Sequence, residues 1–241
     1  MSLYARSSRP QSNLDAFLRT IPLFASLSPN DLADVSHRMT KHKYPSGATL
    51  FYQDTPGAML FIIETGSVRV FGIGLTGQEH TFNTFGPGEI FGELSLLDGR
   101  PRSASAITMS PSVIWMLSKG DFDLLLERCP TFSRSLIVLL AERVRTAASH
   151  VEAIIFQDIQ GRLAYELLAL ADRHGKPVGP TIQIEMPLTQ SDLATMVGAT
   201  RESVNKALTY LRGRELVQVE GNRVTVLNPE GLRRVIHERG R

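Results

Sequence analysis

The chain has 241 residues, enough for two ordinary domains, and its 42% hydrophobic content excludes a wholly disordered protein. Its 26 basic and 24 acidic residues leave a net charge of +2, too small for a histone-like protein or a polybasic membrane binder. The single cysteine, Cys129, excludes an intramolecular disulfide, a cysteine zinc cage and an iron–sulfur cluster built from this chain alone, so we expect a reducing, cytoplasmic environment.

The first half of the chain changes from helical to β pattern. Residues 1–13 are polar and carry no apolar core, so we expect neither an export signal nor a membrane anchor. Helical spacing of apolar residues predicts two short helices, at 14–23 and 32–39. Between 43 and 117 short apolar stretches alternate with closely spaced glycines, which is typical of an antiparallel β-sandwich or barrel with tight turns.

A long helix is predicted over 131–156, because this segment contains neither glycine nor proline. Apolar residues recur along it in steps of three and four, like the a/d seam of a coiled coil. We expect this seam to be the interface of a symmetric homodimer, although the helix could instead pack only on its own sandwich. The seam residues are Ile137, Leu140, Val144, Ala147, Val151 and Ile154.

Residues 158–241 carry the whole net positive charge, with 12 basic and 10 acidic side chains. Their pattern predicts a helix at 159–172, a Gly/Pro loop at 174–180, a strand at 182–186, then two short helices and a hairpin. Any affinity for nucleic acid must be arranged locally in this part, since the net charge of the whole chain is small.

The two short helices have the pattern of a helix-turn-helix. Thr189-Gln190-Ser191-Asp192 matches a capping box, Gly198 allows a sharp turn, and Thr200 can cap the second helix. The second helix would bury one apolar face, formed by Val204, Ala207, Leu208 and Leu211.

The opposite face of that helix carries side chains that can read base edges. Arginine and lysine can donate to guanine, and glutamate can accept from cytosine. An ordinary solvated helix face is the alternative, because such short matches are common. The candidate base-reading residues are Arg201, Glu202, Asn205 and Lys206.

Two alternating strands at 216–219 and 223–226 flank a Gly-Asn pair that suits a two-residue hairpin turn. The hairpin completes a winged helix-turn-helix. In this arrangement Arg223 on the wing, with Thr189 and Gln190 at the first helix, would lie near DNA phosphates and set the register.

The most informative stretch of the predicted sandwich is 86–104, which reads GPGEIFGELSLLDGRPRSA. It resembles the phosphate-binding cassette of cyclic-nucleotide-binding domains. Together with the long helix and the sequence GATRESVNK at 198–206, it makes the chain from about Phe17 onward similar to the CRP/FNR family of bacterial transcription regulators.

The resemblance implies an α+β chain with three parts. An N-terminal jelly-roll β-sandwich of the cyclic-nucleotide-binding type would span 1–130, a dimerisation helix with a hinge at Gln157-Asp158 would span 131–157, and a winged helix-turn-helix would span 158–241. The function implied is a homodimeric, sequence-specific regulator under allosteric control by a cyclic nucleotide, with cyclic AMP (cAMP) the first expectation. Implied partners are palindromic double-stranded DNA with TGTGA-like half-sites, a second copy of the chain and RNA polymerase, with no membrane.

The resemblance also assigns roles within the cassette. Backbone amides and one arginine capture an anion in such a turn, so Arg102 would hold the cyclic phosphate. Glu93 would accept from the ribose 2′-hydroxyl, and Gly92, Leu94 and Ser103 would line the sugar and phosphate. A plain structural ion pair between Glu93 and Arg102 is the alternative reading.

One departure from the family pattern concerns the base. Where cAMP sensors of the family place a Thr-Ser pair on the long helix, this chain has Ala147 and Ala148, whose methyl groups cannot hydrogen-bond a purine. Arg143 and Asn83 are further candidates to approach the base. Three possibilities stay open: cAMP bound with altered affinity, another cyclic nucleotide, or binding with little allosteric effect.

Other classes of function find less support. A haem site or a cupin-like metal enzyme would need ligands around His80, the one histidine between His42 and His150, and no cluster of ligands surrounds it in the sequence. No catalytic triad or Cys-His pair is evident at Cys129. We therefore expect no metal, haem or iron–sulfur cofactor and no enzyme. A regulator that is constitutive or has another effector, and a signalling module that does not bind DNA, stay as alternatives.

Overall fold

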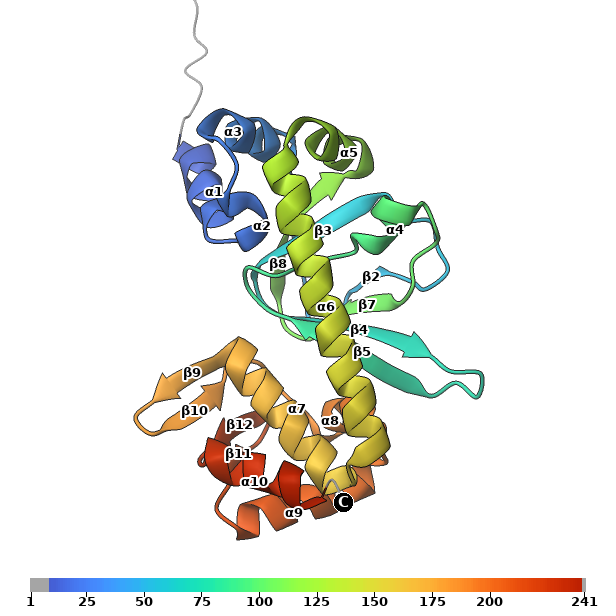
Figure 1. The fold of residues 1–241 in the computed structure, drawn as a ribbon, viewed down its shortest axis with the longest axis vertical. Coiled ribbons are helices and arrows are strands. Elements are labelled where there is room, and N and C mark those ends of the chain that lie inside the picture. Colours follow the sequence, from blue (N-terminus) through green and yellow to red (C-terminus); the bar gives the residue numbers. More distant parts are fainter. Residues whose placement is uncertain (1–8, 240–241) are drawn as a thin grey trace, which may run out of the picture. The chain divides into compact units, whose positions relative to one another are not determined.

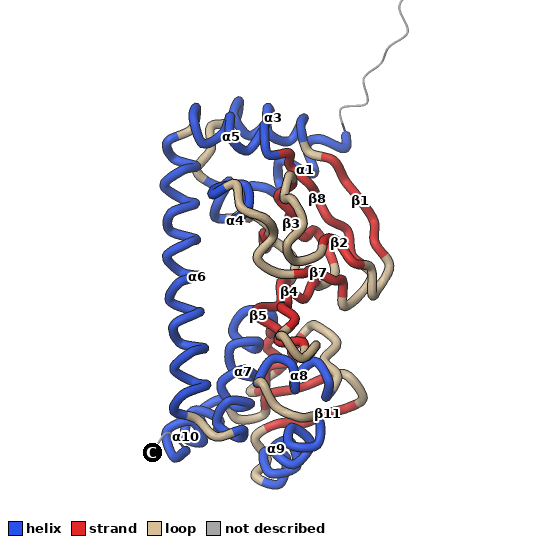
Figure 2. Tube along the Cα trace, turned by 90° about the vertical axis from the view of Figure 1, so that its right-hand side faces the viewer, coloured by secondary structure: helices blue, strands red, loops and turns tan. Residues whose placement is uncertain are grey.

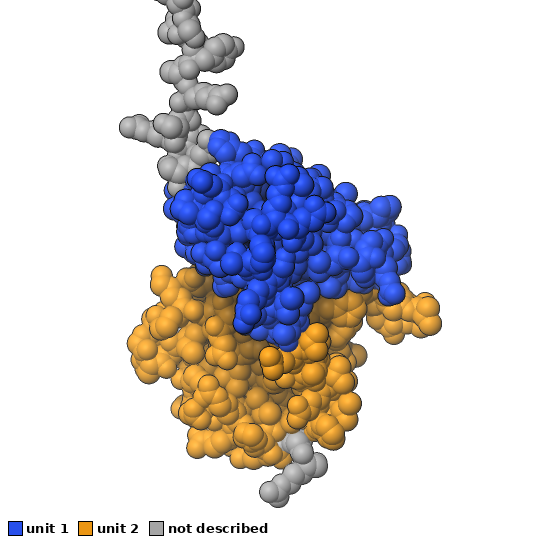
Figure 3. Space-filling model, turned by 45° about the horizontal axis from the view of Figure 1, so that its top comes forward, with its two compact units in different colours: residues 1–67, 85–143 blue, residues 68–84, 144–241 orange. Residues whose placement is uncertain are grey.

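The computed structural model describes residues 9–239 and divides into two compact units. Unit 1 contains residues 1–67 and 85–143, and unit 2 contains residues 68–84 and 144–241 (Figure 3). The helix α6 (Pro130–Phe156) contributes its first half to unit 1 and its second half to unit 2. Figure 2 draws α6 as one unbroken helix, as its lack of internal glycine and proline predicts.

Five further helices of the described residues belong to unit 1. They are α1 (Arg9–Arg19), α2 (Pro22–Ala25), α3 (Pro29–Arg38), α4 (Leu94–Asp98) and α5 (Lys119–Arg128). The prediction of one helix over 14–23 was wrong at both ends, because α1 begins at Arg9 and Pro22 starts a separate helix. Proline is favoured at the first position of a helix, where its missing N–H would have no partner. Ser28 caps α3 by accepting from the backbone N–H of Asp31 at 3.2 Å. Figure 1 shows α1, α3 and α5 grouped at the first turns of α6.

The predicted antiparallel β-sandwich is confirmed. The strands of unit 1 are β1 (Thr40–Tyr44), β2 (Thr49–Phe51), β3 (Met59–Thr65), β6 (Ile90–Phe91), β7 (Ser105–Thr108) and β8 (Ser112–Ser118). One antiparallel sheet has the order β1-β8-β3-β6, with Ile62 opposite Trp115, and β2 pairs with β7. The helices α2, α5 and α6 contribute to the hydrophobic core of this unit. Phe24 and Phe122 each pack against Phe132, with ring centroids 5.7 and 5.8 Å apart.

Unit 2 holds the remaining elements. They are β4 (Val68–Ile73), β5 (Glu79–Phe85), α7 (Ile159–His174), β9 (Gly175–Val178), β10 (Thr181–Ile184), α8 (Gln190–Val197), α9 (Arg201–Gly213), β11 (Val217–Glu220), β12 (Arg223–Val226) and α10 (Pro229–Arg239). The strands β4 and β5 pair as a hairpin, and a second sheet has the order β11-β12-β10-β9. The helix α7 is central, since α8, α9 and α10 all pack on it.

Two sequence expectations for unit 2 need correction. The predicted loop at 174–180 is largely the strand β9, which pairs with β10 so that Val178 lies opposite Thr181 and Gly179-Pro180 form the turn. The predicted strand at 182–186 accordingly begins and ends earlier, at Thr181 and Ile184. The wing has its predicted two-residue turn, with Glu220 opposite Arg223. No helix among residues 9–239 is both long and apolar enough to cross a bilayer.

Candidate functional site

The turn between β6 and α4 is the centre of the predicted cassette. Gly92 adopts a φ of +83°, which is strained for any residue with a side chain. A Cβ atom there would lie 2.8 Å from Nη1 of Arg102 and 3.1 Å from the ring of Phe61. The position therefore requires glycine both for its backbone conformation and for the close approach of the arginine. Glu93 follows at the start of α4, and its carbonyl accepts from the N–H groups of the first turn.

Arg102 is a buried cation whose side chain is held by several hydrogen bonds and by an aromatic ring. Only 4% of the residue is exposed. Nη1 donates to the Gly92 carbonyl at 2.6 Å and to Oγ of Ser95 at 2.9 Å, and Nη2 donates to the Met59 carbonyl at 2.7 Å. The guanidinium carbon lies 4.3 Å from the ring centroid of Phe51. These contacts fix the fork of the guanidinium at the cassette.

The charge of Arg102 has no direct counterion in the part of the chain that the structure describes. Among residues 9–239, no carboxylate forms an ion pair with it, and its Nε has no hydrogen-bond partner. Burial lowers the pKa of the guanidinium, and the field of Glu93 partly opposes this change. Because a buried charge is costly unless it is paired, this arrangement suits an anion that the protein itself does not supply.

Glu93 is paired with the long helix rather than with Arg102. Only 1% of Glu93 is exposed, and its Oε1 accepts from Nη1 of Arg143 on α6. Nη2 of Arg143 donates to the Ile90 carbonyl, and the guanidinium lies 5.4 Å from the ring centroid of Phe85. The other carboxylate oxygen of Glu93, Oε2, is buried and accepts no hydrogen bond from the described residues. The cassette thus offers a free acceptor beside the arginine.

The structure brings Gly92, Glu93, Arg102 and Arg143 together, and Leu94 and Ser103 directly follow Glu93 and Arg102 in the chain. Leu94 and Ser103 are exposed. Asn83 belongs to unit 2, where its Oδ1 accepts from Nη1 of Arg173. Sequence reasoning missed Met59, Ser95 and the ring of Phe51. Ser95 lies within the cassette and could have been predicted. Met59 and Phe51 lie 43 and 51 residues before Arg102, and no local pattern links them to the cassette.

The helix-turn-helix has its predicted caps. Oγ1 of Thr189 accepts from the N–H of Asp192 at 3.1 Å, and Oδ2 of Asp192 accepts from the N–H of Thr189 at 2.8 Å, which completes the capping box. Gly198 ends α8 in the left-handed region, with a φ of +63°. Oγ1 of Thr200 accepts from the N–H of Ser203 at 3.2 Å and caps α9.

The outer face of α9 is exposed and polar, as predicted, and Arg201, Glu202, Asn205 and Lys206 all lie on it. Gln190 at the start of α8 joins this face. Its Nε2 donates to Oδ1 of Asn205 at 3.2 Å, and its Oε1 accepts from Nε of Arg201 at 3.4 Å. The contact of Gln190 with Arg201 was not foreseen, because a helix-turn-helix pattern does not give side-chain pairs between its two helices.

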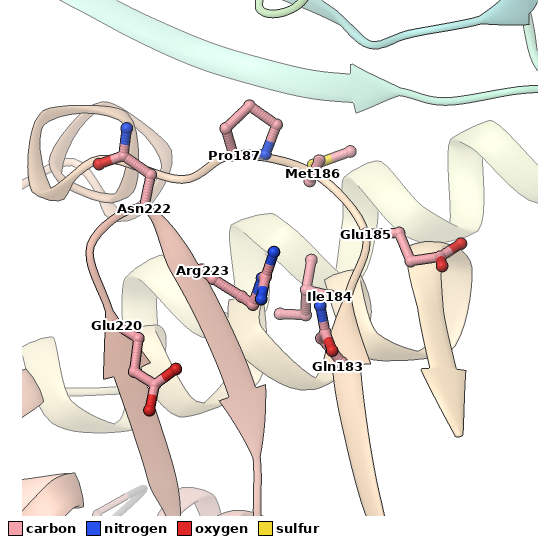
Figure 4. A pocket seen from close by; sticks show the side chains of 8 residues that line it. All are labelled: Gln183, Ile184, Glu185, Met186, Pro187, Glu220, Asn222 and Arg223. Carbon is pink, nitrogen blue, oxygen red and sulfur yellow. The ribbon is translucent and has the colours of Figure 1, made fainter. Parts of the chain in front are cut away.

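The wing borders an open hollow in unit 2. Figure 4 shows Arg223 and Glu220 on neighbouring strands of the wing and Pro187 on the segment that leads to α8. Arg223 is exposed, as a residue on a phosphate-contacting wing must be. Within residues 9–239 no group of three or more His, Cys, Asp or Glu side chains is arranged to hold a metal ion.

The predicted seam of α6 is exposed over most of its length. The exposed fractions are 66% for Ile137, 69% for Val144, 55% for Val151 and 47% for Ile154. Leu140 is half-buried and packs against the core of unit 1, and Ala147 is exposed. Apolar side chains repeated along one helix at this exposure are typical of an interaction surface.

Comparison with known proteins assigns both parts of the chain. Residues 41–129 match the cyclic nucleotide-binding domain, and residues 161–235 match the Crp-like helix-turn-helix domain. A protein of Mycobacterium tuberculosis named "CRP-like cAMP-activated global transcriptional regulator" is 33% identical over 92% of this chain and 99% of its own length. The "Cyclic AMP receptor protein" of Thermus thermophilus is 36% identical over 85% of this chain and 92% of its own length.

Solved structures agree with these relatives. The crystal structure of the Thermus thermophilus catabolite activator protein is 33% identical, covers 90% of this chain and 99% of its own, and has a TM-score of 0.51. FixK2 from Bradyrhizobium japonicum has the same fold, with a TM-score of 0.73 at 20% identity over 82% of this chain and 96% of its own. The matched domains and relatives are those of transcription regulators, not enzymes. This chain belongs to the CRP/FNR family of DNA-binding transcription regulators with a cyclic-nucleotide-binding domain.

Proposed function

We propose that this chain is a homodimeric regulator whose affinity for DNA is set by a cyclic nucleotide, in the first place cAMP, bound at the Arg102 cassette. The observation that carries this proposal is the buried guanidinium of Arg102, which has fixed geometry and no carboxylate partner among residues 9–239. A cyclic phosphate would supply the missing negative charge through two parallel hydrogen bonds. The names of two relatives, at 33% and 36% identity, support cAMP as the nucleotide.

Glu93 would connect the bound nucleotide to the long helix α6. Its free Oε2 would accept from the ribose 2′-hydroxyl while Oε1 stays paired with Arg143 on α6. The ribose would then be joined to α6 through a single carboxylate. Leu94 and Ser103, which are exposed beside Glu93 and Arg102, would line the sugar and the phosphate. A hydrogen-bonded chain of this kind is how binding at one site can bias the position of a distant element.

Calorimetric titration with cAMP, cyclic GMP and 2′-deoxy-cAMP tests the proposal. We expect saturable binding of cAMP near one nucleotide per chain. The deoxy analogue should bind about tenfold more weakly, because it leaves a buried carboxylate oxygen without a donor. We expect little discrimination between cAMP and cyclic GMP, since Ala147 and Ala148 offer the base no hydrogen bond. Absence of binding by either nucleotide would contradict the proposal and favour a constitutive regulator or another effector.

The exposed apolar seam of α6 supports a homodimer, because two copies would bury it against each other in a parallel coiled coil. A twofold dimer presents two copies of α9, which suits a palindromic site with TGTGA-like half-sites. By family resemblance, the β9–β10 hairpin next to α7 would be the surface for RNA polymerase.

Arg201→Ala should cost about 1–3 kcal/mol of DNA-binding free energy and relax the preference at one base pair, because a fork to guanine is lost. Fluorescence anisotropy with a panel of operators mutated at single positions measures both effects. Arg212→Ala, which removes the same charge from the last turn of α9, is the matched control and should leave the base preference unchanged. Equal weakening on every operator would mean that Arg201 contacts only phosphate.

A further inference from the structure

The corner where α6 turns into α7 contains a buried carboxylate and an imidazole that neither the nucleotide site nor the DNA-reading face uses. Glu166 on α7 is 7% exposed, and its Oε2 lies 3.6 Å from Nε2 of His150 on α6. The ring of His150 meets the ring of Tyr165 edge-on, with centroids 5.6 Å apart. We call these three residues, His150, Tyr165 and Glu166, the α6–α7 corner. They lie within unit 2, on both sides of the bend at Gln157-Asp158.

Two arginines of α7 share the side of Glu166. Arg162, four residues before it, donates to the Gln157 and Val197 carbonyls, and Arg173 lies seven residues after it. The field of Arg173 favours the ionised form of Glu166. The guanidinium is already engaged with the β4–β5 hairpin, because Nη1 donates to Oδ1 of Asn83 and to the Thr84 carbonyl. Arg173 thus offsets only part of the cost of a negative charge at Glu166.

The other charged and titratable groups around the corner come from several elements. His80 on β5 and His150 on α6 repel each other's positive charge, and His174 on α7 lies in the field of Arg173. Glu152 on α6 acts on the Tyr165 hydroxyl, which also interacts with Ser149. The helices α8, α9 and α10 pack on α7, and the buried side chains of α9 and α10 are apolar. The immediate environment of Glu166 is consequently poor in compensating charge.

Burial controls the titration of this corner. It raises the pKa of Glu166 from an ordinary value of 4.5 to about 7. It lowers the pKa of His150 and of His80, and with Arg173 it lowers the pKa of His174 to about 4. The histidines are then neutral above their ordinary pKa of 6.5, so only the carboxyl changes its charge as the pH rises through 7.

The sign of the effect follows from the raised pKa. A carboxyl group whose pKa is higher in the folded than in the unfolded chain contributes full stability below the unfolded value, here 4.5. That contribution is lost as the pH rises through about 7, when a negative charge must be held in the buried corner. Ionisation of Glu166 therefore opposes the close packing of α6 against α7.

We propose that the protonated carboxyl group of Glu166 holds the α6–α7 corner closed in the arrangement that binds DNA, so that this regulator senses pH around neutrality. A closed corner fixes α7, and with it α8 and α9, before DNA is met. A loosened corner must become ordered when the protein binds DNA, and the free-energy cost of this ordering lowers the affinity for DNA. The inference rests on DNA binding by this family and is independent of which nucleotide is the effector.

The test compares wild type with Glu166→Gln, a neutral side chain of the same shape, and with Glu152→Gln, which removes an exposed carboxylate from α6 beside the corner. Affinity for a palindromic operator is measured by anisotropy between about pH 6 and pH 8 at constant ionic strength with saturating cAMP. We expect the wild-type affinity to fall at least about threefold over this range, within the limit of about tenfold per pH unit that each of the two Glu166 carboxyls of a dimer allows. The operator affinity of Glu166→Gln should stay at its low-pH value over the whole range, and that of Glu152→Gln should fall with pH as the wild-type affinity does.

Thermal unfolding of the same three proteins provides a second readout that does not involve DNA. The Tm of wild type should fall toward pH 8 relative to that of Glu166→Gln, because only wild type must bury a charge. Parallel pH profiles of wild type and Glu166→Gln, or a wild-type affinity that rises with pH, would overturn the proposal. A failure of all three proteins to bind duplex at any pH would instead count against DNA regulation itself, and the unfolding profiles would still decide whether Glu166 titrates.

Discussion

Replacing Arg102 with glutamine is expected to weaken the binding of cAMP at least about 30-fold, because truncating one partner of a buried, hydrogen-bonded charge pair costs about 2–5 kcal/mol. Glutamine keeps an amide donor at the site but removes the positive charge that the cyclic phosphate would neutralise. Calorimetry or displacement of a fluorescent nucleotide measures the loss. The control is Arg100→Gln, two residues away, whose side chain is 84% exposed and should not affect binding.

Arg102 also supports the cassette itself, since it donates to the Gly92 and Met59 carbonyls. Thermal unfolding therefore accompanies the titration, and Arg102→Lys separates the two roles. Lysine retains the charge and loses the forked geometry, so we expect an affinity between those of wild type and Arg102→Gln. Wild-type affinity in a folded Arg102→Gln protein would show that the phosphate lies elsewhere.

Val144→Glu is expected to convert the homodimer to a monomer at micromolar concentration. Val144 is 69% exposed in the single chain. Burying a valine in the dimer contributes about 1.5–3 kcal/mol, and a symmetric interface loses this contribution twice and brings two like charges together. Sedimentation velocity measures the dissociation, and binding to a palindromic operator should weaken with it, because a monomer contacts one half-site at a time.

The matched control for this experiment is Val138→Glu. Val138 is 52% exposed on the same helix but points about 120° away from Val144, outside the predicted seam. The control protein should remain dimeric. Dissociation of the Val138→Glu protein while Val144→Glu stays dimeric would place the interface on another face of α6.

Much of the fold could be predicted from short sequence patterns. The capping box at Thr189, the cap at Thr200 and the turn at Gly198 each depend on residues within a few positions of one another, and each has the predicted geometry. The strand β9 was not predicted, because two of its four residues are glycine and proline, which are uncommon in strands. It forms a strand because it pairs with β10. The helix α10 was not foreseen either.

Individual residues of the candidate site could be predicted from the sequence, but the side-chain contacts between them could not. Gly92, Glu93 and Arg102 share one short motif, whereas the partner of Glu93 is Arg143, fifty residues later on another element. Asn83, a candidate for the nucleotide base, accepts a hydrogen bond from Arg173 in unit 2, and its contact with the base stays a prediction. Contacts of this range depend on tertiary packing, which spacing and composition do not encode. The predicted boundaries of the three domains and the contact of Gln190 with phosphate stay predictions.

The most direct test of nucleotide control is the affinity of wild-type protein for a palindromic TGTGA duplex, measured by anisotropy at fixed salt with and without saturating cAMP. We predict that cAMP tightens DNA binding at least about tenfold, within the usual range of allosteric coupling, and that the same duplex tightens cAMP binding by the same factor. Equal DNA affinity in the presence and absence of a bound nucleotide would contradict this mechanism.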